Sequence, residues 1–382
     1  MKKVFIISTV LLAVTLLILG VYNFGFKAFE NSSQSKEVKQ PVEQIKTKTE
    51  EAVTKKTEKI SLVSKEPVLS GVADKKTEKV FYYSASDGTI WQVDGEGLNR
   101  IQISDAKIAG LVNASWSPDR LKSLTVIEQA GKKSFFLYDN VKKDSISLKE
   151  GIDNVIWDSL GAKIIYKYYD SKSKKRSLNI ADPDGQNWST LIADIPFRNL
   201  SLATIPLTSI ISFWNSPNSS EESNLQIISA TGGEVKNILK GKFGGDYLWS
   251  PDGSQALVSS LVSKENKTMT LGIIDLQGQY RDLSIPTIVS KCVWSIDGKT
   301  VYYALPGGIP TGANMPNDYQ AKKFTTQDTF WKINIATGNK ERIIELADIQ
   351  GVYDASNLFL STTEDGLFFI NRVDGKLYRI AL

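Results

Sequence analysis

The chain of 382 residues contains no histidine and only one cysteine, Cys292. Without histidine it cannot build Ser-His-Asp or Cys-His nucleophile systems, imidazole metal sites or a histidine general base near neutral pH. A single cysteine excludes an intramolecular disulfide, and Cys292 in the strand-like run KCVW is interpreted as a small buried side chain. We therefore predict neither a bound metal nor a cofactor.

An excess of charge of one sign is also missing. The chain has 46 basic and 42 acidic residues, which gives a formal net charge of +4. So small a charge does not favour nucleic acid as a partner. By contrast, 41% of the residues are hydrophobic and 10% are aromatic, which is enough for a large core. All-β domains often use such a length as one unit.

The first 26 residues are predicted to be a membrane anchor. Lys2 and Lys3 precede an uncharged run, Val4 to Phe26, and about 20 apolar residues suffice to cross a bilayer. The run is longer than the apolar region of a signal peptide, and Tyr22 to Phe26 occupy the place of a small-x-small cleavage site. An uncleaved signal anchor is therefore favoured. The two lysines predict a cytoplasmic N-terminus, with the remaining chain outside the cytoplasm.

Residues 27–58 are predicted to be a flexible tether. Residues 31–58 contain no aromatic residue and no glycine, and are mostly Lys, Glu, Thr, Ser, Gln and Val. Such a composition buries too little apolar surface to offset the entropy of ordering. A flexible coil of this length spans on the order of 30 Å. It would hold residues 59–382 just clear of the bilayer.

A repeated phrase organises residues 59–382. An apolar strand ending in Trp is followed by Ser-Pro-Asp-Gly or a variant, and then by further strands; the clearest copy is YLWSPDGSQALVSS at 247–260. Other copies lie at 114–126, 155–169 and 293–305, with a degenerate copy at 198–214. A spacing of about 40–45 residues with four short strands per unit predicts the blades of a β-propeller.

Each part of the repeat has a mechanical reason. The Trp side chains offer a flat surface for packing between neighbouring blades. In the turn, Pro fixes φ, Asp makes an Asx-type bond and Gly accepts a positive φ. The repeat residues are Trp116, Asp119, Trp157, Trp249, Asp252, Gly253, Trp294, Asp297 and Gly298.

Two internal alignments predict how the ring closes. Residues 80–94 match 367–381 as second and third strands, so the chain ends before the fourth strand of its last blade. Residues 58–72 match 99–113, a fourth strand followed by the next first strand. The segment near 60–63 should thus complete the last blade, a velcro-type closure that removes open edges. First strands near residues 68, 110, 152, 198, 245, 290 and 357 predict seven blades.

The Trp-Ser-Pro-Asp-Gly turn resembles the repeat of TolB-type WD40-like (PD40) propellers, and similar blades form the propeller domain of dipeptidyl peptidase IV relatives. The resemblance covers roughly residues 59–382. It implies the fold rather than a function, because such propellers serve as scaffolds, partner docks and enzyme lids. The α/β domain of TolB has no counterpart in this sequence, and neither has the peptidases' hydrolase domain with its Ser-Asp-His triad.

Two groups of residues are candidate binding sites. A long insertion at 305–328, between the second and third strands of blade six, should project at the mouth of the channel, and loops of this length are often functional. Basic residues also gather in the equivalent loops of other blades, where they suit an anionic partner such as an envelope polymer, lipid headgroups or an acidic protein. A tolerated insertion and solvated lysines are the respective alternatives. The candidate residues are Asn314, Asn317, Asp318, Tyr319, Lys322, Lys174, Lys175 and Arg176.

The anchor, the complete ring and the missing nucleophile systems favour a non-enzymatic binding or scaffolding module that is displayed outside the membrane. The partner would be a protein or an anionic envelope polymer. The alternative is a carboxylate-based glycoside hydrolase or lyase at the channel mouth, since two acids can cleave glycosides without histidine. A third hypothesis is an extracellular sensor domain.

Overall fold

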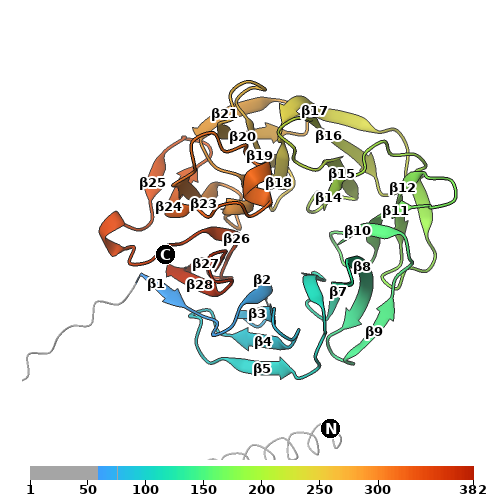
Figure 1. The fold of residues 1–382 in the computed structure, drawn as a ribbon, viewed down its shortest axis with the longest axis horizontal. Coiled ribbons are helices and arrows are strands. Elements are labelled where there is room, and N and C mark those ends of the chain that lie inside the picture. Colours follow the sequence, from blue (N-terminus) through green and yellow to red (C-terminus); the bar gives the residue numbers. More distant parts are fainter. Residues whose placement is uncertain (1–58, 75) are drawn as a thin grey trace, which may run out of the picture. The chain divides into compact units, whose positions relative to one another are not determined.

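A computed structural model describes residues 59–74 and 76–382. These residues form seven four-stranded antiparallel sheets arranged as a ring (Figure 1), which confirms the predicted all-β, seven-bladed propeller. The predicted anchor at 1–26 and tether at 27–58 lie outside the described residues. Among the described residues no helix has the length and apolar character needed to cross a membrane.

Each blade runs outward from the centre of the ring. Blade one consists of β2 (Val68–Asp74), β3 (Lys79–Ser84), β4 (Ile90–Val93) and β5 (Ile101–Ser104), and blade two of β6 (Leu111–Trp116), β7 (Lys122–Gln129), β8 (Lys132–Asp139) and β9 (Asp144–Ser147). Blade three consists of β10 (Ile152–Trp157), β11 (Ile164–Tyr169), β12 (Arg176–Ala181) and β13 (Ser189–Ile192), and blade four of β14 (Leu200–Thr204), β15 (Ile210–Asn215), β16 (Glu222–Ser229) and β17 (Lys236–Phe243). Blade five consists of β18 (Asp246–Trp249), β19 (Gln255–Leu261), β20 (Met269–Asp275) and β21 (Tyr280–Ile285). Blade six consists of β22 (Cys292–Trp294), β23 (Thr300–Gly307), β24 (Gln327–Asn334) and β25 (Lys340–Arg342). Blade seven consists of β26 (Ala355–Leu360), β27 (Gly366–Asn371), β28 (Leu377–Ala381) and β1 (Ile60–Leu62).

The repeated tryptophans join neighbouring blades. Each is buried at the end of a first strand, and its indole N–H donates to the preceding blade. Three of them donate to the backbone of the preceding first strand, and the fourth donates to a serine hydroxyl of β15. The pairs are Trp116 with Ser70 O (2.7 Å), Trp157 with Ser115 O (2.8 Å), Trp294 with Leu248 O (3.0 Å) and Trp249 with Ser212 Oγ (2.8 Å).

The turn after each tryptophan is held by its aspartate. Asp252 Oδ1 accepts hydrogen bonds from Ser250 Oγ (2.5 Å) and from the Ser254 N–H (3.1 Å). Asp119 and Asp297 receive the same pair of bonds in their own blades. Gly253 has a φ of +70°, and a Cβ there would lie 2.3 Å from the Pro206 carbonyl oxygen.

We expect Asp252→Ala to lower the free energy of unfolding by about 1 kcal/mol near neutral pH, because three hydrogen bonds to an exposed carboxylate are lost. The Ser250 hydroxyl and the Ser254 donors hold the pKa of Asp252 below its ordinary value. This contribution is present above the unfolded pKa of about 3.9 and is lost as the pH falls through the lower folded pKa. Urea unfolding at neutral and at acid pH checks this. A matched control is Asp144→Ala, since no described residue bonds to that carboxylate.

The seventh sheet combines both ends of the described chain. β1 pairs antiparallel with β28, with Ile60 opposite Ile380 and Leu62 opposite Tyr378. The Val63 N–H also donates to Leu377 O (2.9 Å), and the side chains of Ile60 and Val63 are buried. The alignment-based prediction therefore matches the observed strand pairing.

Deleting residues 59–64 should lower the melting temperature, because the outer edge of β28 would be exposed. Burial of Ile60 and Val63 contributes roughly 1.5–3 kcal/mol each, partly offset by the chain entropy that the deleted strand no longer loses. Calorimetry measures the change. Leu62→Ala is the control, since this side chain is 52% exposed. An unchanged melting temperature in the deletion variant would show that β1 does not stabilise the last blade.

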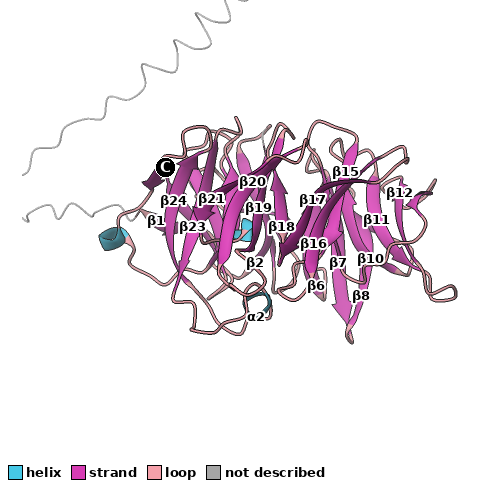
Figure 2. Ribbon diagram, turned by 90° about the horizontal axis from the view of Figure 1, so that it is seen from above, coloured by secondary structure: helices cyan, strands magenta, loops and turns pink. Residues whose placement is uncertain are grey.

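The loops divide between two faces of the ring. Antiparallel order places the loops between second and third strands on the same face as the links from one blade to the next; we call this the mouth face. The turns after the first and third strands lie on the opposite face. β1 starts and β28 ends at that opposite face, and Figure 2 shows the C-terminus and α2 (Asn317–Gln320) on opposite sides.

The insertion in blade six is packed onto the mouth face. β23 extends to Gly307 and β24 begins at Gln327, so the insertion is shorter than predicted, and it contains the short helix α2. Met315 and Tyr319 are buried against Leu261, Met269 and Ile288. At Gly244, whose φ is +62°, a Cβ would lie 2.8 Å from Pro316. The insertion is thus a fixed part of the mouth face.

Candidate functional site

Two adjoining cavities open on the mouth face, and together we call them the mouth cleft. The first has a volume of about 770 Å³ and lies between the links and loops of blades three and four and α2. The second has a volume of about 410 Å³ and lies between α2 and the inner strands of blades five and seven. Pro217 and Gln320 line both cavities.

Asp246 is the central acid of the second cavity. It is the first residue of β18, and its Oδ1 accepts hydrogen bonds from Trp214 Nε1 and the Tyr247 N–H, both at 3.1 Å. No described residue donates to Oδ2. Burial raises the pKa of Asp246 to about 6, against the opposing effect of these two hydrogen bonds. A carboxyl group with such a pKa can exchange protons with a substrate near neutral pH.

Two cationic side chains line the same cavity. Lys322 has no hydrogen-bond or ion-pair partner for its ammonium among the described residues. Arg372 lies over the ring of Tyr319, with Cζ 3.8 Å from the ring centroid, donates to the Tyr319 carbonyl oxygen (2.8 Å), and lies 3.5 Å from Asp354 Oδ2. The second cavity therefore combines a proton-exchanging carboxyl group with cations suited to an anionic ligand.

The first cavity contains a second group of charged residues. Lys167 is buried, and its ammonium lies 2.9 Å from Asp153 Oδ2 and also donates to the Arg198 carbonyl oxygen. Burial raises the pKa of Asp153, although Lys167 opposes the rise. Glu221 lines the same cavity and accepts a hydrogen bond from Asn218 (3.2 Å). Two acids from different blades therefore line this part of the cleft.

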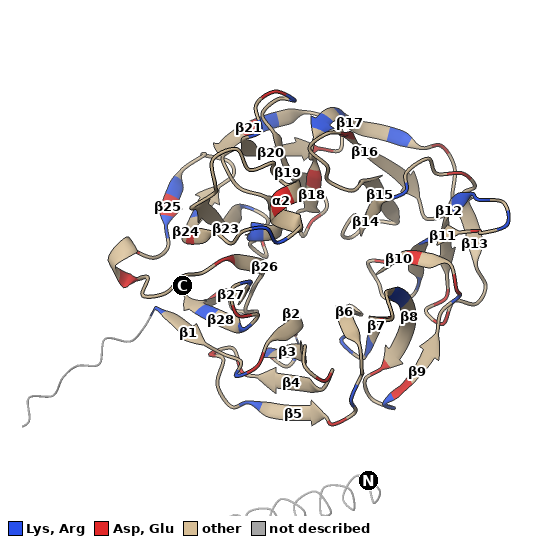
Figure 3. Cartoon of the chain, viewed as in Figure 1, with Lys and Arg blue, Asp and Glu red and all other residues tan. Residues whose placement is uncertain are grey.

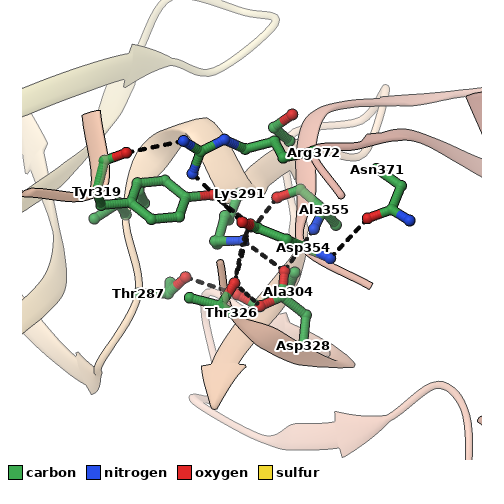
Figure 4. A network of polar contacts seen from close by, with 12 residues as sticks. Thr287, Lys291, Ala304, Tyr319, Thr326, Asp328, Asp354, Ala355, Asn371 and Arg372 are labelled. Carbon is green, nitrogen blue, oxygen red and sulfur yellow. Dashed lines mark hydrogen bonds and ion pairs between the residues drawn. The ribbon is translucent and has the colours of Figure 1, made fainter. Parts of the chain in front are cut away.

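A buried charge network fixes the wall of the second cavity (Figure 4). The fully buried ammonium of Lys291, at the end of a 3₁₀ turn (Val289–Lys291), contacts Asp328 Oδ2 at 2.5 Å and Asp354 Oδ1 at 2.8 Å. It also donates to Thr326 Oγ1 (3.1 Å) and to the Ala355 carbonyl oxygen (2.9 Å). The network thus joins the link into blade six, the start of β24 and the link into blade seven.

Tyr319 ties α2 to this network. Its hydroxyl donates to Asp354 Oδ1 (2.6 Å). Burial would raise the pKa of Asp354, but the nearby Lys291 ammonium and the Tyr319 and Thr326 hydroxyls lower it below its ordinary value. At Asp328 burial outweighs Lys291, and the pKa is raised. Burial and the bond to Asp354 also raise the pKa of Tyr319, so its role is to hold α2 in place.

The candidate residues from the insertion take different places. Asn317, Tyr319 and Lys322 line the mouth cleft. Asn317 bridges to blade four: its Oδ1 accepts from the Ser219 N–H (2.8 Å) and its Nδ2 donates to Asn218 (3.1 Å). The other two stabilise the insertion itself, since Asp318 accepts from the Asn314 N–H (2.8 Å) and pairs with Lys323 (2.7 Å).

The basic group Lys174, Lys175 and Arg176 does not join them. These residues belong to the hairpin between β11 and β12, which projects at the outer edge of the ring in Figure 3. Lys175 lies 3.8 Å from Asp194, and the Arg176 guanidinium lies 4.8 Å from the centroid of the Tyr169 ring. Lys174 and Lys175 therefore lie apart from the insertion, whereas the charge of Arg176 acts on Asp153 in the first cavity and opposes the rise of its pKa by burial.

Asp246, Asp153 and Lys291 were not predicted from the sequence, whose repeat places aspartates in the turns after the tryptophans, as at Asp119, Asp252 and Asp297. Asp246 and Asp153 instead begin first strands or lie next to their starts, three and four residues before Trp249 and Trp157 respectively. An acidic residue three or four positions before a repeat tryptophan is the sequence signal by which these two aspartates could have been found.

The chain matches no protein-family model and no curated protein. Among solved structures it is similar to an oligogalacturonate lyase in complex with manganese (14% identity, TM-score 0.61, covering 85% of this chain and 93% of that chain). A second oligogalacturonate lyase, from Vibrio parahaemolyticus, has 12% identity and a TM-score of 0.61. The match covers 84% of this chain and 93% of that chain. The β-propeller domain of the trilobed protease from Pyrococcus furiosus is also similar, with 13% identity and a TM-score of 0.52. The match covers 82% of this chain and 92% of that domain.

These similarities establish the fold. The β-propeller domain of the trilobed protease bears out the propeller fold that the resemblance to TolB-type WD40-like propellers implied. The prediction of a non-enzymatic binding or scaffolding module is wrong on this comparison, because the two lyases cover most of the chain and favour the enzyme alternative. The physical reason is that missing histidine excludes histidine chemistry only, whereas the carboxyl groups of the cleft come together through the fold.

A manganese site like that implied by one of these lyases does not fit the described residues of this chain. No group of three or more acidic or cysteine side chains in the described ranges could hold a metal ion, and the sequence supplies no imidazole. Manganese is bound by carboxylate, carbonyl and imidazole ligands.

Proposed function

We propose that the chain is a carboxylate-based lyase that cleaves acidic oligosaccharides in the mouth cleft. The observation that carries the proposal is Asp246, a carboxyl group with a pKa of about 6 in a cavity that also presents Lys322 and Arg372. The similarity to two oligogalacturonate lyases supports the reaction class. A uronic acid residue offers both the carboxylate that cations bind and an acidic C5–H.

The roles follow from β-elimination. Asp246 Oδ2, which receives no hydrogen bond from the described residues, accepts the C5 proton of a uronic acid residue. Lys322 and Arg372 neutralise the carboxylate, because charge develops on it when the C5–H bond breaks. The C5–H electron pair forms the C4–C5 double bond, the C4–O4 bond breaks, and O4 leaves with a proton taken from water.

Hydrolysis in the first cavity is the second candidate. Asp153, whose pKa is raised by burial, and Glu221 line the same cavity from neighbouring blades. A protonated and an ionised carboxyl group that flank a glycosidic bond are the requirements of a glycoside hydrolase. In this alternative Asp153 is the general acid and Glu221 the base or nucleophile.

Product analysis tests the proposal and separates the two candidates. The full-length chain is incubated with oligogalacturonate, and both new reducing ends and the ultraviolet absorbance of unsaturated uronate are followed. We expect the two signals to rise together. Reducing ends without absorbance would support hydrolysis, and neither signal on a panel of acidic and neutral oligosaccharides would contradict a glycan-cleaving enzyme.

We further propose that residues 1–26 anchor the chain in the cell membrane, that residues 27–58 tether it, and that the propeller at 59–382 lies outside the cytoplasm. In support, the described chain begins at the face opposite the mouth cleft, so a tether attached there leaves the cleft free for a polymer. Protease added to intact cells should remove the propeller. Protection of the propeller until the cells are lysed would contradict this placement.

A further inference from the structure

Ser259 is a buried polar side chain without a partner in the described structure. It lies on β19, is 1% exposed and lines the second cavity, yet its hydroxyl has no hydrogen bond to any described residue. Leaving a buried hydroxyl unsatisfied costs about 1–3 kcal/mol. The cavity that Ser259 lines is the place from which a partner for Oγ can come.

Three buried serines on the same or neighbouring strands are satisfied, whereas Ser259 on β19 and Ser219 in the loop between β15 and β16 are not. Ser260, the next residue on the same strand, donates to the Leu261 carbonyl oxygen (3.2 Å). Ser212 and Ser223 donate to the carbonyl oxygens of Ala203 (3.0 Å) and Asn215 (3.4 Å). The fold thus provides acceptors to these three serine hydroxyls, but none to the Ser259 hydroxyl on the cavity wall.

Ser259 and Asp246 face each other across a strand pair. They are direct partners in the antiparallel register of β18 and β19, so their side chains lie on the same side of the sheet. Both line the second cavity. Because the two donors to Asp246 both reach Oδ1, its Oδ2 and Ser259 Oγ remain as neighbouring unpaired oxygens.

We propose that Asp246 Oδ2 and Ser259 Oγ form a subsite for one hydroxyl group of a sugar ring. The ligand hydroxyl donates to one lone pair of Asp246 Oδ2 and accepts from the serine, so both protein groups gain a partner, and the second lone pair of Oδ2 stays available for the C5 proton. Lys322 and Arg372, on the same cavity, bind the carboxylate of that ring when it is a uronic acid. The choice of ligand class rests on the proposed function, whereas the paired oxygens come from the geometry.

The affinity of the full-length chain for free D-galacturonic acid tests the subsite. We expect saturable binding in an NMR titration, and a roughly 5- to 10-fold higher Kd for Ser259→Ala, as for the loss of one neutral hydrogen bond. Ser260→Ala is the matched control. It should keep the wild-type Kd but melt at a lower temperature, because it loses a satisfied bond. Ser259→Ala should melt at or above the wild-type temperature.

The Kd values and the melting temperatures distinguish a sugar-binding role of Ser259 from a structural one. Equal Kd values for the wild type and Ser259→Ala, or no binding by the wild type at any attainable concentration, would overturn the subsite. A lower melting temperature for Ser259→Ala would show that the hydroxyl has a structural partner. The monosaccharide cannot be cleaved, so sugar binding that depends on Ser259 would support the subsite even if no oligosaccharide were cleaved. Conversely, if oligosaccharides are cleaved but sugar binding does not depend on Ser259, the proposed function stands and the subsite does not.

Discussion

Replacing Lys291 by methionine is expected to lower the free energy of unfolding by about 3–5 kcal/mol, because it leaves buried carboxylates without their counter-charge. Asp328 and Asp354 are both fully buried, and their oxygens lie 2.5 Å and 2.8 Å from the Lys291 ammonium. Arg372, the remaining cation, lies 3.5 Å from Asp354 Oδ2. Arg372 compensates part of the charge of Asp354. Asp328 has no cation other than Lys291 within ion-pair distance among the described residues.

Chemical unfolding of Lys291→Met measures this effect, and an exposed pair provides the control. Lys332 lies 3.3 Å from Glu341 with 38% of its side chain exposed. Lys332→Met should therefore change stability by less than about 1 kcal/mol. A Lys291→Met variant as stable as the Lys332→Met control would show that the network does not hold blades six and seven together. Weaker protection of α2 against hydrogen exchange should accompany the loss, since Tyr319 is bound to Asp354.

Asp246→Asn is expected to lower kcat/KM for acidic oligosaccharides by about 10²–10⁴-fold, the usual contribution of a positioned general base. The amide keeps the shape of the side chain but cannot accept the C5 proton. Melting should change little, because the amide oxygen can still accept from Trp214 Nε1 and the Tyr247 N–H. The experiment follows unsaturated product at equal protein concentration.

Two further variants locate the effect. Asp275→Asn, in a turn on the opposite face, should keep the wild-type rate. Asp153→Asn should lower the rate severely only if the first cavity is the reaction site. Full activity of Asp246→Asn together with an inactive Asp153→Asn would transfer the chemistry to the first cavity and refute the role assigned to Asp246.

The propeller could be predicted from the sequence because its signals are local and repeated. The Trp and Asp-Gly corners recur at blade spacing, and each fixes a turn or an indole contact within or between adjacent blades. Even the pairing of Ile60 with Ile380 followed from matching two segments of the repeat. A degenerate copy was recognisable, since Ile205 and Pro206 stand where the other copies have the residues that follow the tryptophan, and the Ile205 N–H donates to Ile210 O as the Ser250 N–H donates to Gln255 O.

The cleft could not be predicted in the same way, because its residues come from blades that are far apart in the sequence. Asp246 and Lys322 meet at one cavity only when the insertion of blade six crosses to blade four through Asn317. Lys291 shows no signal of its own, since a lysine before a strand is ordinarily solvated. Its burial depends on Asp328 and Asp354, which belong to two separate blades.

The pH dependence of kcat/KM on oligogalacturonate shows whether Asp246 is poised as a base by its burial in the cleft. Burial raises the pKa of Asp246 to about 6, and a carboxyl group accepts a proton only above its pKa. If Asp246 is the base, the rate rises as the pH increases through about 6 and then levels off. A rate that is flat across this range, or that falls as the pH rises through it, would rule out this role.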